Sequence, residues 1–375
     1  LSPNSDFLIS LSDNNEKDVT HIEKNQGIVF PFPNPLIINL DATTKHDGQT
    51  TEAQYILKGN SYNVISGIGR FTRKENTQEI SQVFTGGAPL APPTTTNTID
   101  NRQNNNVYIY STIKPVSGTS ITLGASYDDF NSTILKERDI FSPKLGAIIE
   151  LNNNTTLRLA AFKSLAKATL NTKTIEPSHI AGFNQFFDDF AGVTSERYGL
   201  GLDHKSSSKF SYGLELTGRK IKYAPSSIDI EQNELLHRVY FNSIFSDKIT
   251  FSLSYIFDRF ESKSIIPSLP DKVRTQSLPI SIKFIHPNGL FTGIQATGVD
   301  QEVRLSSVDY DEQFVVTDAW IGYRFPNRRG TINLLVKNIA DTQFNYQDRN
   351  FQTSEPAQPQ YVPDRTLYLN LNLTL

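Results

Sequence analysis

The strongest constraint on the fold of this chain is a two-residue alternation of apolar and polar side chains. In the last segment five leucines alternate with polar residues or tyrosine: Leu367, Tyr368, Leu369, Asn370, Leu371, Asn372, Leu373, Thr374 and Leu375. A strand sends alternate side chains to opposite faces, so this segment predicts a strand with one aliphatic face. The same period recurs at 121–128, 210–217, 249–258 and 278–285, and more weakly in nine other stretches. The chain is therefore expected to be all-β.

The connections between the alternating segments fall into two length classes. The short ones are rich in turn residues and lie at 115–118, 152–154, 206–208, 246–248, 286–289 and 327–330. The long ones are expected at about 73–105, 164–194, 223–233, 261–275, 300–312 and 340–364. Alternating short and long connections are typical of bacterial outer-membrane barrels, with tight periplasmic turns and long outer loops.

The composition allows two β architectures, a large soluble β protein or an outer-membrane barrel. Of the 375 residues 37% are hydrophobic and 11% aromatic, and no stretch approaches the roughly 18 consecutive apolar residues of a spanning helix. The two classes of connection favour a transmembrane antiparallel β-barrel of about 16 strands, within a range of 14 to 18. A barrel of that size leaves room for an aqueous lumen.

Several function classes are excluded or disfavoured by the residues present. The net charge of −3 lacks the dominant basic field of a nucleic-acid binder. With no cysteine, the chain has neither disulfides nor a thiolate site. The GxSxG, HExxH, Walker and dinucleotide-glycine patterns do not occur, and the six histidines are not at metal-ligand spacing. Asp128-Asp129 and Asp188-Asp189 are the alternative of a loop calcium site and a Ser/His hydrolase is the alternative enzyme, but acidic turn residues are more often solvated and no spacing selects a catalytic pair. We therefore expect no enzyme activity, no metal and no cofactor.

The phase of the alternation assigns side chains to two faces. The lipid-facing set is Phe251, Leu253, Tyr255, Leu369, Leu371 and Leu373. The lumen-lining set is Arg158, Arg197, Asp203, Glu215, Arg219, Arg238, Asp258, Lys283, Asp318 and Arg324. Charged residues near the bilayer midplane must point inward because each lipid-facing Arg or Lys there costs roughly 2–4 kcal/mol. These charges either contact a solute or brace the wall as ion pairs.

Aromatic residues near strand ends form a further expectation. They include Tyr62, Tyr108, Tyr110, Tyr127, Tyr198, Tyr212, Tyr255, Tyr323 and Tyr368. Amphipathic rings suit the headgroup level of a bilayer, so we expect a lipid-facing girdle.

The connection at 164–193 is the strongest candidate for a functional loop. Its apolar and polar residues are mixed, and a connection of this length is usually functional or disordered. The residues expected to form a lumen constriction or a cap on the outer mouth are Phe183, Asn184, Phe186, Phe187, Asp188 and Asp189. By contrast, the Pro-, Thr- and Asn-rich stretch 85–106 is expected to be a mobile, exposed loop.

Three stretches near the C-terminus, and several others along the chain, carry a family resemblance. Trp320–Phe325, the run Val336-Lys337-Asn338-Ile339-Ala340-Asp341 and the stretch from Pro363 to Leu375 resemble the last strands of TonB-dependent receptors. Stretches including Glu52–Ile56, Leu157–Phe162, Thr174–Asp189 and His286–Phe291 look closer to barrels at the C-terminus of tetratricopeptide-repeat proteins of Gram-negative bacteria. We expect a single transmembrane barrel over 51–375, with 1–50 as a lead-in that can hold one or two strands. Residues 1–50 are too few for the plug of such a receptor.

Three functions follow from the fold and the resemblance. The first is an outer-membrane channel for a solute or polymer, with polysaccharide export implied by the resemblance. The second is a TonB-dependent-receptor-like uptake barrel without a plug in this chain. The third is a structural barrel that anchors a surface or periplasmic assembly. Each implies the outer membrane of a Gram-negative bacterium, with membrane lipid and periplasmic repeats or other proteins as partners.

Overall fold

A computed structural model describes residues 4–28, 35–135, 137–169, 173–187, 189–223, 230–262, 270–305, 309–348 and 360–374. In these ranges seventeen strands form one sheet, and the two-residue β9 (His179–Ile180) and β10 (Phe183–Asn184) form another. The large sheet consists of β1 (Ser5–Ile28), β2 (Pro35–Lys58), β3 (Tyr62–Thr85), β4 (Ala88–Pro89), β5 (Thr94–Ile113), β6 (Thr119–Ser132), β7 (Arg138–Asn152), β8 (Thr155–Leu165), β11 (Thr194–Lys205), β12 (Phe210–Tyr223), β13 (Ile230–Ser246), β14 (Ile249–Ser262), β15 (Lys272–Ile285), β16 (Leu290–Arg304), β17 (Asp309–Arg324), β18 (Gly330–Lys337) and β19 (Thr366–Leu373).

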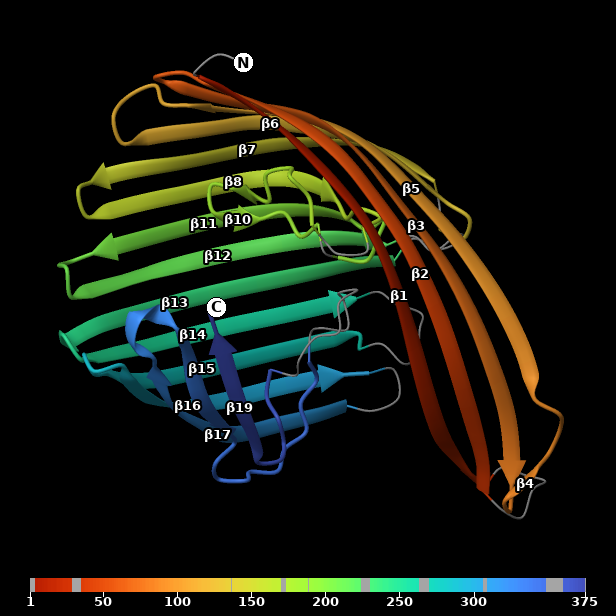
Figure 1. The fold of residues 1–375 in the computed structure, drawn as a ribbon. Helices are drawn as coiled ribbons and strands as arrows, with labels where there is room; N and C mark the ends of the chain where they lie inside the picture. Colours follow the sequence, from red (N-terminus) through yellow and green to blue (C-terminus); the bar gives the residue numbers. More distant parts are fainter. Residues whose placement is uncertain are drawn as a thin grey trace.

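All strand pairs of the large sheet are antiparallel, and their registers follow the order of the chain. They run from β1–β2 to β18–β19, with β3 pairing β5 and β8 pairing β11. Leaving out the two-residue β4, the seventeen strands give sixteen long ones. The sheet curves into a barrel wall (Figure 1). This confirms the predicted all-β antiparallel barrel of about 16 strands.

The two ends of the barrel differ as the sequence indicated. Tight connections join β5 to β6, β7 to β8, β11 to β12, β13 to β14, β15 to β16 and β17 to β18, the last through the short helix η1 (Pro326–Arg328). All six lie at the predicted turns. The longest connections, 166–193 and 338–365, lie at the other end. Antiparallel strands place alternate connections at opposite ends, so the long connections share one end of the barrel.

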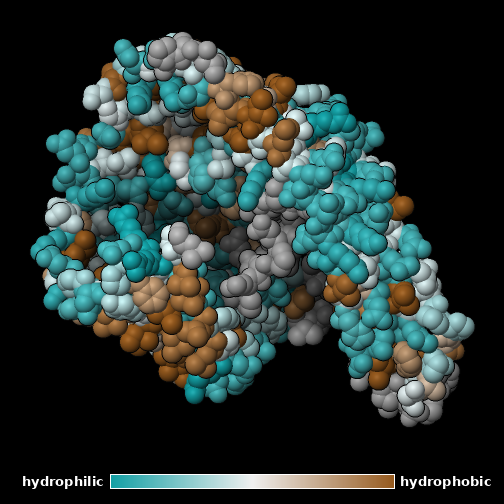
Figure 2. All heavy atoms as spheres, viewed as in Figure 1, coloured by the Kyte–Doolittle hydropathy of each residue, from teal (hydrophilic) through white to brown (hydrophobic). Residues whose placement is uncertain are grey.

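The expected long connection at 73–105 is wrong. The structure places β3 up to Thr85 and begins β5 at Thr94, with a register from Tyr62↔Ile113 to Ser81↔Thr94. The stretch 85–106 is therefore mostly strand. Its side chains are polar on both faces, so the alternation that marks a half-buried strand is missing. With β1 and β2, these strands form a polar extension beyond the barrel wall, here called the wing (Figures 1 and 2).

The convex face of the sheet carries exposed apolar side chains. All six residues predicted to face lipid lie on it: Phe251, Leu253, Tyr255, Leu369, Leu371 and Leu373. The ring of Phe251 lies 6.2 Å from that of Phe241 and 6.0 Å from that of Phe245, which makes an aromatic cluster at the short-turn end. Figure 2 shows apolar surface over β16–β19 and hydrophilic surface over the wing. Contact of these six residues with lipid stays a prediction.

The N-terminal region continues the same architecture. β1 and most of β2 come from residues 1–50, and β2 crosses the expected boundary at residue 50. No helix in the described ranges is long and apolar enough to span a membrane.

Candidate functional site: a segment folded inside the barrel wall

The segment between β8 and β11, residues 166–193, folds back onto the concave face of the sheet. At its base the backbone N–H of Ala166 donates to Val193 O at 2.8 Å, and that of Gly192 donates to Ala166 O at 2.9 Å. At its tip β9 and β10 form a hairpin through Ala181 and Gly182, both with positive φ. The segment contacts strands as far apart as β2, through Glu52, and β12, through Arg219. It therefore lies inside the curve of the sheet (Figure 1).

Two strands on one side of the barrel hold this segment by hydrogen bonds. The Glu52 carboxylate of β2 accepts from Thr174 Oγ1 at 2.5 Å and from the Ile175 N–H at 3.1 Å. Tyr110 of β5 donates its hydroxyl proton to Glu176 Oε1 at 2.5 Å. The contacts join residues more than 60 positions apart, so they fix the segment to the wall rather than to its own ends.

A buried ion pair lies at the centre of these contacts. Lys167 Nζ pairs with Glu176 Oε2, and both side chains are at most 1% exposed. The Lys167 ammonium also lies 4.9 Å from the ring centroids of Phe71 and Phe187, a cation–π geometry. Removing one partner of a buried pair leaves an uncompensated charge, so the segment is strongly held in this position.

A second anchor holds the segment to β11 and β12. The ring of Phe186 contacts two guanidinium groups, 4.6 Å from that of Arg197 and 4.1 Å from that of Arg219. Arg219 in turn donates to Asp189 Oδ2 at 2.6 Å and to Glu234 Oε2 at 2.7 Å. Phe186 has a φ of 52°, a region that costs a non-glycine residue free energy. The packing around its ring compensates for that strain.

The tip of the segment packs on the middle of β8 and β11. Phe183 is 1% exposed, in a cluster with Tyr108, Tyr110 and Phe162. Its ring lies 5.0 Å from the Arg158 guanidinium. A Cβ on Gly199 would come within 2.6 Å of this ring, so the glycine is what allows the close approach.

The structure thus places five of the six loop residues predicted from the sequence. Phe183, Asn184, Phe186, Phe187 and Asp189 all belong to the inward-folded segment, and Asn184 contributes its backbone oxygen to Arg197 at 2.8 Å. Asp188 lies outside the described residues. That these residues constrict a solute path is a proposal taken up below.

The predicted lumen-lining charges all lie on the concave face, and three of them meet. Arg158 Nε donates to Asp203 Oδ2 at 2.7 Å, and Arg158 Nη2 donates to Glu215 Oε2 at 3.0 Å. Tyr240 donates its hydroxyl proton to Asp203. This ladder crosses β8, β11, β12 and β13. It has the form expected of ion pairs that brace the wall.

The other predicted charges are spread along the wall. Arg238 lies 5.1 Å over the Tyr240 ring, and Lys283 lies 5.8 Å over that of Trp320. Asp258 lies between them on β14, and Arg324 lies at the short-turn end of β17. The structure does not bring these four into one cluster.

The connection between β18 and β19 also folds inward. Asp318 accepts from the Asn338 N–H at 2.8 Å, and the Asn338 amide donates to three backbone oxygens of the same connection. Phe344 stacks on Phe314 of β17 with centroids 4.0 Å apart. The concave face is therefore covered on two walls by ordered segments.

Three residues predicted for the aromatic girdle lie on the concave face: Tyr108, Tyr110 and Tyr368, the last because its neighbour Leu369 points to the convex face. Tyr108 and Tyr110 are 2% and 3% exposed and lie under the inward segment. Their neighbours Val107 and Ile109 occupy the convex face instead, because adjacent residues of a strand point to opposite sides. The exposure of Tyr62, Tyr127, Tyr198, Tyr212 and Tyr255 on the sheet surface agrees with a girdle.

Sequence analysis missed the polar residues that receive the segment. They are Glu52, Gln54, Asp128, Lys144, Lys167, Glu176 and Gln185, all buried on the concave face or in the segment. The alternation of polar and apolar residues gave one indication of these sites, in β2. Glu52 and Gln54 alternate with Ala53 and Tyr55, which marks one face of β2 as polar.

The concave face of the wing has a separate network of charges. Asp100 accepts from Arg102 Nε at 2.5 Å, Ser132 Oγ at 2.9 Å and Thr133 Oγ1 at 3.1 Å. Burial would raise the pKa of the Asp100 carboxyl, but the hydrogen bonds and the Arg102 charge outweigh it and hold the pKa below its ordinary value. Asp100 is thus a fixed negative charge that ties β5 to β6.

Comparison with known proteins places the fold. No protein-family model and no curated protein matches the sequence. Among solved structures, the ferric citrate transporter FecA matches with a TM-score of 0.63 at 13% identity, over 99% of this chain and 60% of that one. The ferric-catecholate import receptor Fiu from Escherichia coli K12 matches with 0.66 at 13% identity, over 100% and 62%. The pyoverdine receptor FpvA from Pseudomonas aeruginosa matches with 0.61 at 13% identity, over 98% and 59%.

These likenesses show that the chain has the barrel fold of outer-membrane receptors. The chain spans about three fifths of the length of these structures. The shared fold does not show that this chain binds or transports the ligands of these receptors.

Proposed function

We propose that this chain forms the wall of an outer-membrane transport barrel in a Gram-negative bacterium, and that residues 166–193 are a resident constriction on its solute path. The observation that carries this proposal is the buried attachment of the segment to both sides of the wall. On one side Tyr110 of β5 donates to Glu176, which also forms a buried ion pair with Lys167, and on the other Arg219 of β12 pairs with Asp189. A surface cap would not need ion pairs buried inside the barrel.

The convex face supports a membrane location. Exposed apolar side chains alternate with concave polar ones over most strands, as a lipid-facing wall requires. The partners of the barrel are then membrane lipid and the solute. The chemistry at the concave face consists of hydrogen bonds and ion pairs, which suits passage and binding.

The similar solved structures favour uptake into the cell, as by a receptor, over export. FecA, Fiu and FpvA are named as a transporter, an import receptor and an outer-membrane receptor. Polysaccharide export with periplasmic tetratricopeptide repeats, and a purely structural anchor, are the competing functions.

Single-channel conductance tests the proposal. The full-length protein is compared with a variant in which residues 168–191 are replaced by a two-residue Asn-Gly turn, which closes a hairpin between β8 and β11. We expect a small or closed conductance for the intact protein and a larger, steady one for the variant. The bonds between Ala166 and Gly192 or Val193 are kept, so the strand ends remain paired.

A control deletion separates the constriction from general damage. Shortening the tip of the wing around Gly87, outside the barrel wall, should leave conductance unchanged. Equal conductance for the intact protein and the 168–191 variant would contradict the constriction. The absence of conductance in both proteins would favour a structural barrel that anchors an assembly.

A further inference from the structure

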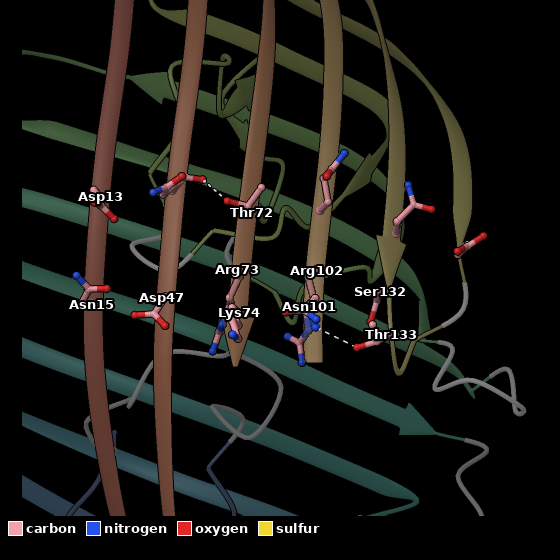
Figure 3. Close-up of a pocket in the computed structure, with 14 residues that line it drawn as sticks. Asp13, Asn15, Asp47, Thr72, Arg73, Lys74, Asn101, Arg102, Ser132 and Thr133 are labelled. Carbon is pink, nitrogen blue, oxygen red and sulfur yellow. Dashed lines mark hydrogen bonds between the residues drawn. The ribbon is translucent and has the colours of Figure 1, made fainter. Parts of the chain in front are cut away.

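The convex face of the wing contains a wide polar hollow that the proposed transport function does not use. Its volume is about 690 Å³, and it extends over β1, β2, β3, β5 and β6. Figure 3 shows side chains from these neighbouring strands lying side by side across the sheet. The lining is Asp13, Asn15, Asp47, Gln49, Thr72, Arg73, Lys74, Asn101, Arg102, Gln103, Asn131, Ser132, Thr133 and Glu137.

The strand registers arrange much of this lining in two parallel rows. One row runs across five strands: Asp13, Gln49, Thr72, Gln103 and Asn131. The next row, two residues further along each strand, consists of Asn15, Asp47, Lys74 and Asn101. Neighbouring strands lie about 4.8 Å apart, so each row is a regular ladder of donors and acceptors.

The chemistry of the lining excludes most ligand classes. Its three carboxylates are Asp13, Asp47 and Glu137, and Lys74 is its one convex-face cation, because Arg73 and Arg102 point to the concave face and pair there with Glu75 and Asp100. This excess of carboxylates disfavours anionic ligands such as polyphosphates. None of the lining residues is aliphatic or aromatic, which disfavours acyl chains and apolar peptides. Amide side chains both donate and accept hydrogen bonds, as the hydroxyl groups of a saccharide do.

Several lining side chains are available to a ligand. In the part of the chain that the structure describes, the side chains of Asp13, Asn15, Asp47 and Lys74 make no hydrogen bond or ion pair. Asn101 is tied through its backbone N–H to Thr133 Oγ1 at 3.0 Å, which leaves its amide group open. The hollow thus has fixed positions and unused polar groups.

The position of the hollow identifies the source of the saccharide. Four residues below Asp13 on the same face of β1, Ile9 begins a row of the apolar band that includes Ile68, Val107 and Phe141, all exposed. Four residues of strand span about 13 Å. A lipid whose acyl chains lie against this band carries its headgroup to the hollow.

We propose that this hollow binds the saccharide headgroup of a glycolipid in the leaflet around the long-connection end of the barrel. The proposal rests on the membrane placement given under the proposed function, but not on conductance. The glycolipid holds the base of the wing at the headgroup level beside the barrel.

The test compares two variants with matched side chains. Gln49→Ala with Asn101→Ala removes two lining amides, whereas Gln78→Ala with Asn97→Ala removes the same groups outside the hollow on the same face. Each full-length protein is reconstituted in phosphatidylcholine vesicles with digalactosyldiacylglycerol. Glycolipid that stays bound through detergent extraction is measured by mass spectrometry. The loss of two hydrogen bonds should weaken retention about tenfold or more for the lining variant, and the control should match the wild type.

Two outcomes would overturn the proposal. Equal retention by all three proteins would show that the hollow is not the binding site. Binding of the free disaccharide as strong as that of the lipid-linked one would assign the hollow to a soluble glycan instead. Vesicle flotation measures membrane insertion separately. A protein that fails to insert would contradict both the transport barrel and the glycolipid site, whereas a protein that inserts but retains no glycolipid would contradict the glycolipid site alone.

Discussion

Tyr110 donates its hydroxyl proton to Glu176, a residue 66 positions later in the chain. The donor belongs to the barrel wall and the acceptor to the segment inside it. The other oxygen of Glu176 pairs with Lys167. One carboxylate therefore joins the wall, the base of the segment and its middle.

Breaking the Lys167–Glu176 pair should release the segment. Lys167→Met leaves Glu176 buried without its cation, which costs about 3–5 kcal/mol. We expect faster hydrogen exchange in residues 173–187 and a more open conductance. The double variant Lys167→Met with Glu176→Gln has no unpaired charge and keeps an acceptor for Tyr110, so it should restore protection. A segment as protected in the single variant as in the wild type would refute the role of the pair.

Gly199→Ala should displace the tip of the segment. The added Cβ would lie 2.6 Å from the Phe183 ring, and the ring must move. Overpacking of this kind typically costs about 1–3 kcal/mol. Gly298→Ala is the matched control, because no atom lies within 4 Å of its Cβ position. Protease sensitivity of the β9–β10 hairpin should rise in the first variant alone.

Phe186→Leu should loosen the second anchor. It keeps an apolar side chain but removes the ring that contacts Arg197 and Arg219, and each cation–π contact is worth about 0.5–2 kcal/mol. Hydrogen exchange near Asp189 should therefore increase. Phe183→Leu, at the tip, should leave exchange near Asp189 unchanged. The opposite pattern would place the anchor at the tip.

Leu371→Arg should block assembly in the membrane, whereas Asn370→Arg should be tolerated. Leu371 lies on the convex face opposite Ile332, and Asn370 lies on the concave face opposite Asn333. A cation on the lipid side near the midplane costs roughly 2–4 kcal/mol. The heat-dependent gel mobility of the folded barrel reports the result. Equal behaviour of the two variants would invalidate the assignment of faces.

Acid should loosen the wing before the barrel wall. The pKa of Asp100 is depressed in the folded protein, so its contribution is complete above the unfolded value of 3.8 and is lost as pH falls below that value through the folded pKa. Hydrogen exchange of residues 94–102 should rise in that window. Asp100→Asn should show little further change with acid, and an unchanged acid response in this variant would rule out the carboxylate as the cause.

The sequence predicted what local periodicity controls. Alternation placed Leu371 and Arg158 on opposite faces, and the turn residues at 286–289 and 327–330 marked two of the tight connections. These features depend on neighbours within a few residues of each other.

Long-range packing decided the features that sequence analysis missed. Tyr108 looks like a girdle residue until the segment from β8 covers it, and no local pattern shows that Gln54 donates to its hydroxyl at 3.0 Å. The wing was missed for a different reason. Polar side chains on both faces of β3 and β5 remove the period that marks a strand.

The length of the wing has a practical consequence for membrane topology. β3 contains 24 residues, about 80 Å at 3.3 Å per residue, whereas a bilayer with its headgroups is about 40–45 Å thick. With the wall spanning a membrane as proposed, the turn at Gly86 and Gly87 lies beyond the headgroups, and a side chain at Gly87 would meet no atom within 4 Å. Antibody binding to an epitope tag inserted at this turn in intact cells would show which side of the membrane the long connections occupy.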